Sequence, residues 1–248
     1  MIFSFLQTGV FGHGKTASGH AHSSFQFYGV IIGKRSTLKS SNLKLAMMRD
    51  IREPVRRFYK LLCTYKNQPE ELYAFLLENM RAVYFARREI LYPYRSVISD
   101  AVFVSSGFLL AYGFNSRGHR QLLQVLPAGS ILLSKSFIHQ SPTSVEVIAL
   151  ADTYVIFLNH ADWIFALRYF EDAELLAMLI ISDYSQREQL RLLGLSEKAD
   201  KVIQDFYSAY PEFLAHGFLL DLDISSYLLI GEQTLRNVRM KLFREGRL

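Results

Sequence analysis

The chain has 248 residues, of which 50% are hydrophobic, and this is enough for one large domain or two small ones with real cores. Its formal net charge is +5, but residues 1–49 carry six basic and no acidic residues, so the other 22 basic and 23 acidic residues give −1. The global charge is therefore no evidence for nucleic-acid binding by the folded part. No apolar run is long enough to cross a bilayer, and a single cysteine excludes a disulfide framework, so we expect a soluble, cytoplasmic protein with no membrane partner.

Residues 1–46 are rich in glycine, serine, lysine and histidine and show no sustained helical or strand periodicity. We expect a disordered extension, or an artefact of the start site with translation beginning at Met47. An organellar transit peptide is the alternative, because the segment is basic and serine-rich, although it holds little arginine.

One motif in this segment matches a nucleotide-binding pattern. Gly9, Gly14, Lys15 and Thr16 fit G-x-x-x-x-G-K-[ST], in which backbone amides cradle phosphates and the threonine binds magnesium. The loop should open a helix, yet residues 17–24 contain glycine, serine and histidine without an apolar stripe. A nucleotide hydrolase is therefore a disfavoured alternative. Three nearby histidines are interpreted as solvated rather than as metal ligands: His13, His20 and His22.

The region 47–160 is predicted to form two helices followed by a β-roll. Apolar positions recur at helical spacing between residues 50 and 89, and Pro69 starts the second helix. Short β-rich runs separated by turns follow at 96–104, 108–114, 120–126, 130–133, 145–150 and 154–158. Strands at this spacing indicate an antiparallel, jelly-roll-like β-roll with flanking helices, so the fold class is α+β. The histidines within the predicted strands and their turns, His119 and His139, are isolated, which disfavours a cupin-like metal catalyst.

Residues 161–195 are predicted to form one long connecting helix. The stretch 175–193 carries more apolar residues than one stripe of a small monomer needs, which favours a homodimer seam. Residues 196–248 are predicted to form four short helices. These cover 198–209, a segment begun by Tyr210 and Pro211, 223–229 with Asp223 as its cap, and a last helix from Gly231 to about Arg244.

The last two helices form the pattern of a helix-turn-helix, because a short helix, a turn with glycine and a basic final helix follow one another. On a helical wheel Leu235, Val238 and Leu242 share one face of the last helix. The opposite face is polar and basic, with Gln233, Arg236, Asn237, Met240 and Arg244. Amides suit adenine edges, and arginines suit guanine or phosphate, so double-stranded DNA is the expected partner. A solvated face on an ordinary terminal helix is the alternative.

Residues 223–242, DISSYLLIGEQTLRNVRMKL, resemble the helix-turn-helix of Crp/Fnr-type transcriptional regulators, D-I-A-S-Y-L-G-I-x-x-E-T-L-S-R-x-R-x-K-L. Residues 191–193 before Tyr210 and Pro211 are similar to the family's hinge, and residues 136–153 are similar to its β-roll. The resemblance covers roughly residues 80–242. It implies a cyclic-nucleotide-binding-like β-roll, a dimerising helix and a C-terminal winged-helix domain, in a regulator that is not an enzyme and holds no cofactor or metal.

Departures from the family pattern concern first the effector site. Placing Ala149 on the family's alanine puts Thr143 where the phosphate-binding arginine stands, and no arginine occurs in residues 121–167. Because a buried phosphate would lack a cation, we expect no binding of cyclic AMP. The β-roll is expected to sense a different small molecule or none. The candidate contacts for such an effector are Lys135, His139, Thr143 and Ser144.

The DNA-reading end also departs from the pattern, since Leu229 replaces the turn glycine and Gly231 replaces the Ser or Thr cap. A leucine at positive φ costs about 1 kcal/mol, so a reshaped turn is one expected outcome. The resulting hypothesis is a homodimer that reads bases with Gln233 and Asn237 and a base or a phosphate with Arg236. The expected phosphate contacts are Arg239, Lys241 and Arg244. A degenerate member that binds a protein partner and never touches DNA is the alternative.

Overall fold

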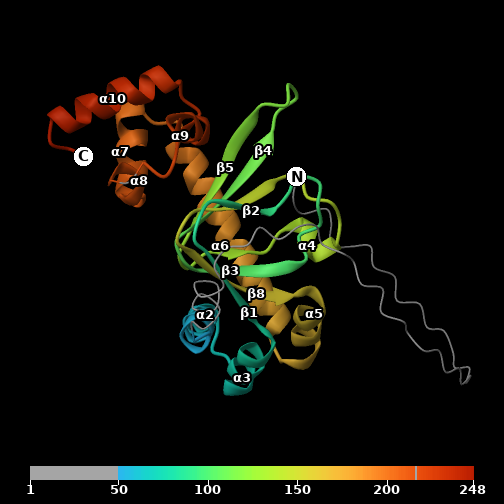
Figure 1. Cartoon of the computed structure of the whole chain (residues 1–248). Helices are drawn as coiled ribbons and strands as arrows, with labels where there is room; N and C mark the ends of the chain where they lie inside the picture. Colours follow the sequence, from blue (N-terminus) through green and yellow to red (C-terminus); the bar gives the residue numbers. More distant parts are fainter. Residues whose placement is uncertain (1–49, 216) are drawn as a thin grey trace, which may run out of the picture. The chain divides into compact units, whose positions relative to one another are not determined.

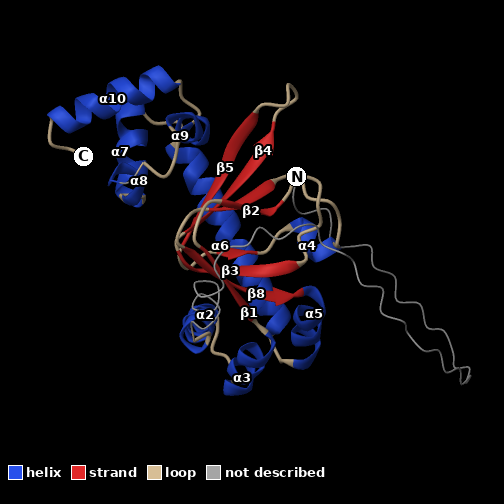
Figure 2. Cartoon of the chain, in the orientation of Figure 1, coloured by secondary structure: helices blue, strands red, loops and turns tan. Residues whose placement is uncertain are grey.

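The computed structural model describes residues 50–215 and 217–248, in which two helices, two antiparallel sheets and a helical C-terminal part follow one another along the chain (Figures 1 and 2). The segment 1–46 lies outside the described residues, and so do the phosphate-loop pattern at Gly9 to Thr16 and the three histidines near it. Among the described helices, none combines the length and the apolarity that a bilayer span requires.

The two helices expected at the start of the folded region are confirmed as α2 (Arg52–Tyr65) and α3 (Glu70–Asn79). Val55, Phe58 and Leu62 recur at helical spacing in α2, and all three are buried. Pro69 takes the N-cap position of α3, where a missing backbone N–H costs no helical hydrogen bond. The two helices share one apolar cluster with Phe103 of the β-roll.

The predicted β-roll is confirmed as two four-stranded antiparallel sheets. One sheet has the strand order β1-β8-β3-β6 and the other β2-β7-β4-β5. The strands are β1 (Arg81–Phe85), β2 (Glu89–Tyr92), β3 (Asp100–Ser106), β4 (Phe108–Phe114), β5 (Arg120–Pro127), β6 (Ile131–Leu132), β7 (Glu146–Ala149) and β8 (Thr153–Asn159). The sequence predicted no strand before residue 96, so β1 and β2 were missed. Also unpredicted was the short helix α4 (Lys135–His139), which Ser134 caps by accepting a hydrogen bond from the Phe137 N–H.

The turn between β3 and β4 requires a glycine. Gly107 has φ +78°, and a Cβ placed there would lie 2.5 Å from Thr153 Oγ1. That hydroxyl accepts a hydrogen bond from the Phe108 backbone N–H at 3.1 Å, which connects β8 of one sheet to the start of β4 in the other. Val102, Val155 and Phe157 lie in the apolar core that the two sheets enclose.

The single helix expected over residues 161–195 is wrong, because two helices occupy this range: α5 (His160–Tyr169) and α6 (Ala173–Gly194). They separate at residues 170–172, where Phe170 is buried with extended backbone and Asp172 is left-handed with φ +65°. Apolar side chains stand exposed on α6, among them Leu175, Met178 and Ile181. Helix α6 therefore carries the surface predicted for dimerisation.

Four C-terminal helices were expected, and the described part of this region contains four: α7 (Ala199–Ala209), α8 (Glu212–Ala215), α9 (Asp221–Leu228) and α10 (Glu232–Arg244). They enclose an apolar cluster that includes Ile203, Phe206, Ile224 and Leu235. No strand occurs in the described residues beyond Asn159, so the wing of a winged-helix domain, which the resemblance implied, is not found there. In its described residues, the C-terminal part is therefore a helix-turn-helix that consists of helices without a wing.

Candidate nucleic-acid interface

The turn between α9 and α10 has left-handed backbone at Leu229, the position at which the sequence resemblance implied a glycine. Leu229 has φ 55° and ψ 36°, and its N–H donates to the Ser225 carbonyl. The Ile230 N–H donates to the same carbonyl at 3.1 Å, which closes the end of α9. Gly231 then takes the N-cap position of α10. Leu229 thus adopts the left-handed backbone conformation itself, which costs about 1 kcal/mol relative to glycine.

Helix α10 is anchored by one face and exposes the other, as the helical wheel predicted. Leu235 and Leu242 are fully buried, and Val238 packs partly against the same cluster. The exposed side chains include Gln233, Arg236, Asn237, Met240, Lys241 and Arg244. Arg239 departs from this group, because its side chain is only 24% exposed. The exposed face carries amides together with cations.

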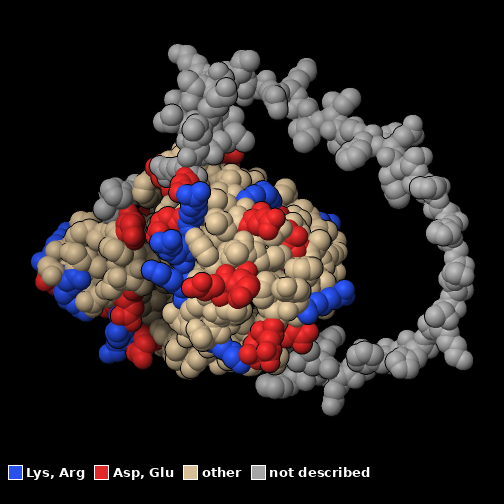
Figure 3. Space-filling view, turned by 90° about the horizontal axis from the view of Figure 1, so that it is seen from below, with Lys and Arg blue, Asp and Glu red and all other residues tan. Residues whose placement is uncertain are grey.

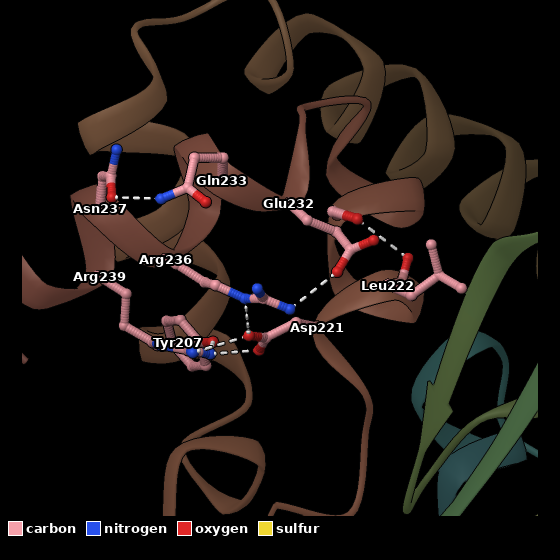
Figure 4. A network of polar contacts seen from close by, with 9 residues as sticks. Tyr207, Asp221, Leu222, Glu232, Gln233, Arg236, Asn237 and Arg239 are labelled. Carbon is pink, nitrogen blue, oxygen red and sulfur yellow. Dashed lines mark hydrogen bonds and ion pairs between the residues drawn. The ribbon is translucent and has the colours of Figure 1, made fainter.

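The exposed cation Arg236 is already ion-paired within the protein. Its Nε lies 3.0 Å from Asp221 Oδ2, and its Nη2 lies 3.0 Å from Glu232 Oε2. Figure 4 shows the guanidinium held between these two carboxylates, one from the start of α9 and one from the first turn of α10. Two charge-assisted hydrogen bonds thus hold the side chain close to its own domain.

Arg239 also binds the Asp221 carboxylate. Its Nη1 lies 2.6 Å from Asp221 Oδ1 and its Nη2 lies 3.0 Å from Asp221 Oδ2, which is a bidentate pair. The Tyr207 hydroxyl accepts a third hydrogen bond from Arg239 at 3.0 Å. The hydrogen bond from Arg239 lowers the pKa of Asp221, and the same bond raises the pKa of Arg239. Arg239 therefore joins α7, α9 and α10 to one another.

Other cations near α10 also have partners. Lys241 Nζ lies 2.6 Å from Asp200 Oδ2 of α7, and Arg247 bonds Glu245 and Gln204. Arg244 forms no ion pair with any residue in the described ranges. On the face drawn in Figure 3, groups of basic and acidic side chains likewise lie next to one another.

The two amides predicted to read bases form a pair of their own. Gln233 Nε2 donates to Asn237 Oδ1 at 2.8 Å, and both side chains are exposed at the outer face of α10. The structure thus brings Gln233, Arg236 and Asn237 together on one exposed face, as the wheel predicted. The acidic and phenolic partners Asp221, Asp200 and Tyr207 were missed, because they come from helices whose placement beside α10 no sequence spacing reveals.

Asp223 was predicted as the cap of α9, and this is wrong. The helix begins at Asp221 with Leu220 at its N-cap, and Asp223 is 6% exposed. Its carboxylate faces the β-roll, where Arg88 and Arg120 each lie 3.8 Å away. The nearby Tyr112 has a raised pKa, mainly from burial and then from the charge of Asp223. The buried acid contacts the β-roll rather than a helix end.

Strand β5 forms direct hydrogen bonds with α9. The Leu122 backbone N–H donates to Ser226 Oγ at 3.0 Å, and Gln121 Nε2 donates to the Ser226 carbonyl at 3.4 Å. From α6, Arg191 donates to the Tyr227 carbonyl at 3.3 Å and lies over the Tyr227 ring. The helix-turn-helix is therefore bonded to both the β-roll and α6.

A cavity of about 510 Å³ lies between the β-roll and α6. Three candidate effector contacts line it, namely Lys135, Thr143 and Ser144, whereas His139 is not in its lining. Thr143 is buried, and its Oγ1 accepts from the Val145 N–H at 3.1 Å. Of the described residues that line the cavity, Lys135 is the one cation, and none is arginine or an acid.

The chain was compared with known proteins by sequence and by structure, and only the structures gave matches. No sequence family matches the chain, and no curated protein matches it. FixK2 from Bradyrhizobium japonicum is similar in structure with a TM-score of 0.57 and 17% identity, over 67% of this chain and 86% of that one. A protein from Eubacterium rectale assigned to the Crp/Fnr family also gives 0.57, at 14% identity over 73% and 87%. The c-di-GMP-responsive regulator CLP from Xanthomonas campestris gives 0.52, at 11% identity over 72% and 93%.

These likenesses cover 67% and 73% of this chain for the first two structures. The described chain therefore has the fold of the Crp/Fnr-type regulators.

Proposed function

We propose that this protein is a DNA-binding transcriptional regulator of the Crp/Fnr type. The observation that carries the proposal is the exposed row of Gln233, Arg236 and Asn237 on α10, in a helix-turn-helix whose buried face is anchored by Leu235 and Leu242. An exposed second helix of this kind enters the major groove in helix-turn-helix proteins. The fold shared with FixK2 supports the same reading.

In the proposed complex, Gln233 and Asn237 contact base edges, and Arg244 contacts a phosphate. Arg239 and Lys241 were expected to contact phosphates too, and each first has to leave an acidic partner, Asp221 or Asp200. Because counterion release from phosphates sets the salt dependence of binding, fewer unpaired cations give a shallower dependence. We therefore propose a protein whose binding to random DNA is weak.

The proposed regulator is a cytoplasmic homodimer that pairs through α6. Met178 and Ile181 are exposed on this helix, and contiguous exposed apolar side chains mark interaction surfaces. Two copies joined in this way would place two α10 helices about 34 Å apart, in successive major grooves of one duplex.

The proposed effector site is the cavity that Lys135, Thr143 and Ser144 line. Hydroxyl groups and apolar side chains dominate this lining, and the sequence resemblance aligns Thr143 with the arginine that binds a cyclic phosphate. Isothermal titration with cyclic AMP is therefore expected to give no binding at physiological concentration. Micromolar affinity would contradict this part of the proposal.

The test of the main proposal combines contact with selectivity. Purified full-length protein is mixed with fragmented genomic DNA, and the retained fragments are sequenced. Binding to a recovered fragment and to random duplex is then measured by fluorescence anisotropy over a range of salt concentrations. Enrichment of a two-fold symmetric sequence with salt-dependent affinity supports the proposal, and indifference to both duplexes contradicts it.

A second candidate function is a protein-interaction module without DNA binding. One observation favours it, namely that Arg236, Arg239 and Lys241 are all ion-paired inside the domain. The same anisotropy measurement separates the two functions, because a module that binds only a protein partner binds neither duplex at any salt concentration.

A further inference from the structure

We infer that Asp221 is a specificity-determining residue: it holds Arg236 away from the duplex and leaves the amides of Gln233 and Asn237 as the base-reading pair, with a preference for adenine. The inference rests on the proposed function, and it assigns to Arg236 neither a base nor a phosphate contact in the wild-type protein. Its basis is the set of contacts at the start of α9 and along α10, drawn in Figure 4.

Arg236 is held by two carboxylates at once. Its Nε bonds Asp221 at 3.0 Å, and its Nη2 bonds Glu232 at 3.0 Å. Its side chain is 52% exposed, so burial does not keep it from a duplex, and the two carboxylates do. A phosphate or a guanine edge has to displace both of these charge-assisted bonds before it gains Arg236.

Asp221 itself is fixed from the opposite side. Arg239 binds it in a bidentate pair, and Tyr207 accepts a hydrogen bond from Arg239. The Asp221 side chain is 23% exposed, and from the start of α9 it bonds Arg236 and Arg239, which are three positions apart on α10. Because Arg239 holds the carboxylate in place, Asp221 cannot swing away with Arg236 when DNA approaches.

The amide pair keeps both acceptor and donor groups for a ligand, the combination with which glutamine and asparagine bind an adenine edge. Since Gln233 Nε2 donates to Asn237 Oδ1, the Gln233 Oε1 acceptor and the Asn237 Nδ2 donor remain for a ligand. Adenine presents one donor and one acceptor in the major groove, whereas guanine presents two acceptors and needs two donors. The pair therefore matches adenine, and the side chain that would match guanine, Arg236, is withheld.

The experiment compares four full-length proteins by anisotropy on the recovered duplex and on random duplex: wild type, Asp221→Asn, Arg236→Gln and the double variant. In the wild-type background we expect Arg236→Gln to change affinity by less than about twofold. In the Asp221→Asn background the same replacement should cost about fivefold or more, because the released arginine now contacts DNA. Asp221→Asn alone should tighten binding to random duplex and steepen the salt slope by about one unit.

Base preference gives a second readout. Selection from randomised duplexes should yield adenine at the position read by the amide pair in the wild-type protein. For Asp221→Asn we expect one position to shift toward guanine, since a guanine edge then has to displace only the bond from Arg236 to Glu232.

Two further variants serve as controls. Asp205→Asn removes an acid of α7 that pairs with Lys201 of the same helix, so it should leave affinity and base preference unchanged. Glu232→Gln frees Arg236 on its other side without touching Arg239, so it should tighten binding in the same direction even if Asp221→Asn fails to fold.

The outcomes separate the inference from the proposed function. If wild type binds DNA and Arg236→Gln already costs fivefold, the inference is overturned and the regulator remains. If neither wild type nor any variant binds either duplex, the proposed function is overturned together with the inference. If wild type and Asp205→Asn bind poorly while Asp221→Asn and Glu232→Gln bind well, the inference that these carboxylates keep Arg236 from DNA is supported directly.

Discussion

The Asp223 carboxylate of α9 lies 3.8 Å from the Arg120 guanidinium of β5, so a buried acid of the helix-turn-helix faces a cation of the β-roll. Arg120 is itself stacked over the Tyr112 ring at 4.0 Å and paired with Glu146. Asp223 Oδ2 has no hydrogen-bond partner among the described residues. Coulomb attraction rather than hydrogen bonding therefore dominates this contact.

Replacing Asp223 by alanine should weaken the attachment of α9 to β5. We expect a loss of about 1 to 2 kcal/mol in the free energy of unfolding, because Arg88 and Arg120 are partly exposed and can find water. Hydrogen exchange at the Leu122 amide, which bonds Ser226, should accelerate. Asp205→Ala is the matched control, and unchanged protection of Leu122 in Asp223→Ala would argue against the contact.

Replacing Leu229 by glycine should stabilise the protein by about 1 kcal/mol, because glycine adopts the left-handed backbone without a Cβ penalty. The leucine side chain is 63% exposed, so little packing is lost. Urea unfolding measures the change. Leu192→Gly, at an exposed position inside α6, should instead destabilise by about 1 kcal/mol, and a shared sign for the two variants would refute the explanation.

The stability contributed by Asp221 should depend on pH in a defined direction. The hydrogen bond from Arg239 lowers the pKa of Asp221 in the folded state, so this stability is fully present above the unfolded pKa of 3.8. It is lost as the pH falls through the lower folded pKa. We expect Asp221→Asn to reduce the free energy of unfolding by about 1 to 2 kcal/mol at neutral pH, and the difference from wild type to shrink below about pH 3.8.

Urea titrations of both proteins at a series of pH values provide the measurement. A difference between wild type and Asp221→Asn that stays constant down to about pH 2 would show that the Asp221 charge contributes nothing.

Replacing Met178 by glutamate should dissociate the proposed dimer. Met178 is exposed on α6, and a charge placed in an apolar seam has to be desolvated on association. We expect sedimentation equilibrium to give a monomer mass for Met178→Glu and a dimer mass for wild type. Ile90→Glu changes an exposed apolar residue of β2 instead and should leave the dimer intact. A monomeric wild type would exclude pairing through α6.

Local patterns in the sequence predicted the elements whose own residues determine them. The run 108–114 is β4 to the residue, since apolar side chains continue through a strand that is buried over five successive positions. The amphipathic pattern from residue 198 predicted α7, where Val202, Ile203 and Phe206 are buried at helical spacing. The spacing of the apolar residues and the flanking turn residues were sufficient to predict both elements.

Elements that depend on tertiary contacts were not predicted. Strand β1 reads like a continuation of α3, and its strand conformation depends on pairing with β8. The division of residues 161–195 arises at Phe170, whose ring packs against Phe75 of α3. Neither contact leaves a trace in local spacing.

The candidate site shows the same division between local and distant determinants. The wheel correctly placed Gln233 and Asn237 outward and Leu235 inward. It could not reveal that Asp221 would meet Arg236, because the two are fifteen positions apart on different helices. The local sequence therefore predicts which side chains of a helix point outward. It does not predict which ion pairs they form, because those depend on residues of other helices.

Because one carboxylate serves both Arg236 and Arg239, these arginines do not act as independent charges. Truncating either one leaves Asp221 with a spare acceptor that the other can take up, so the free-energy changes of single replacements along α10 will not add. A residue-by-residue alanine survey of this helix would undervalue each arginine, and the pair is the unit whose replacement is interpretable.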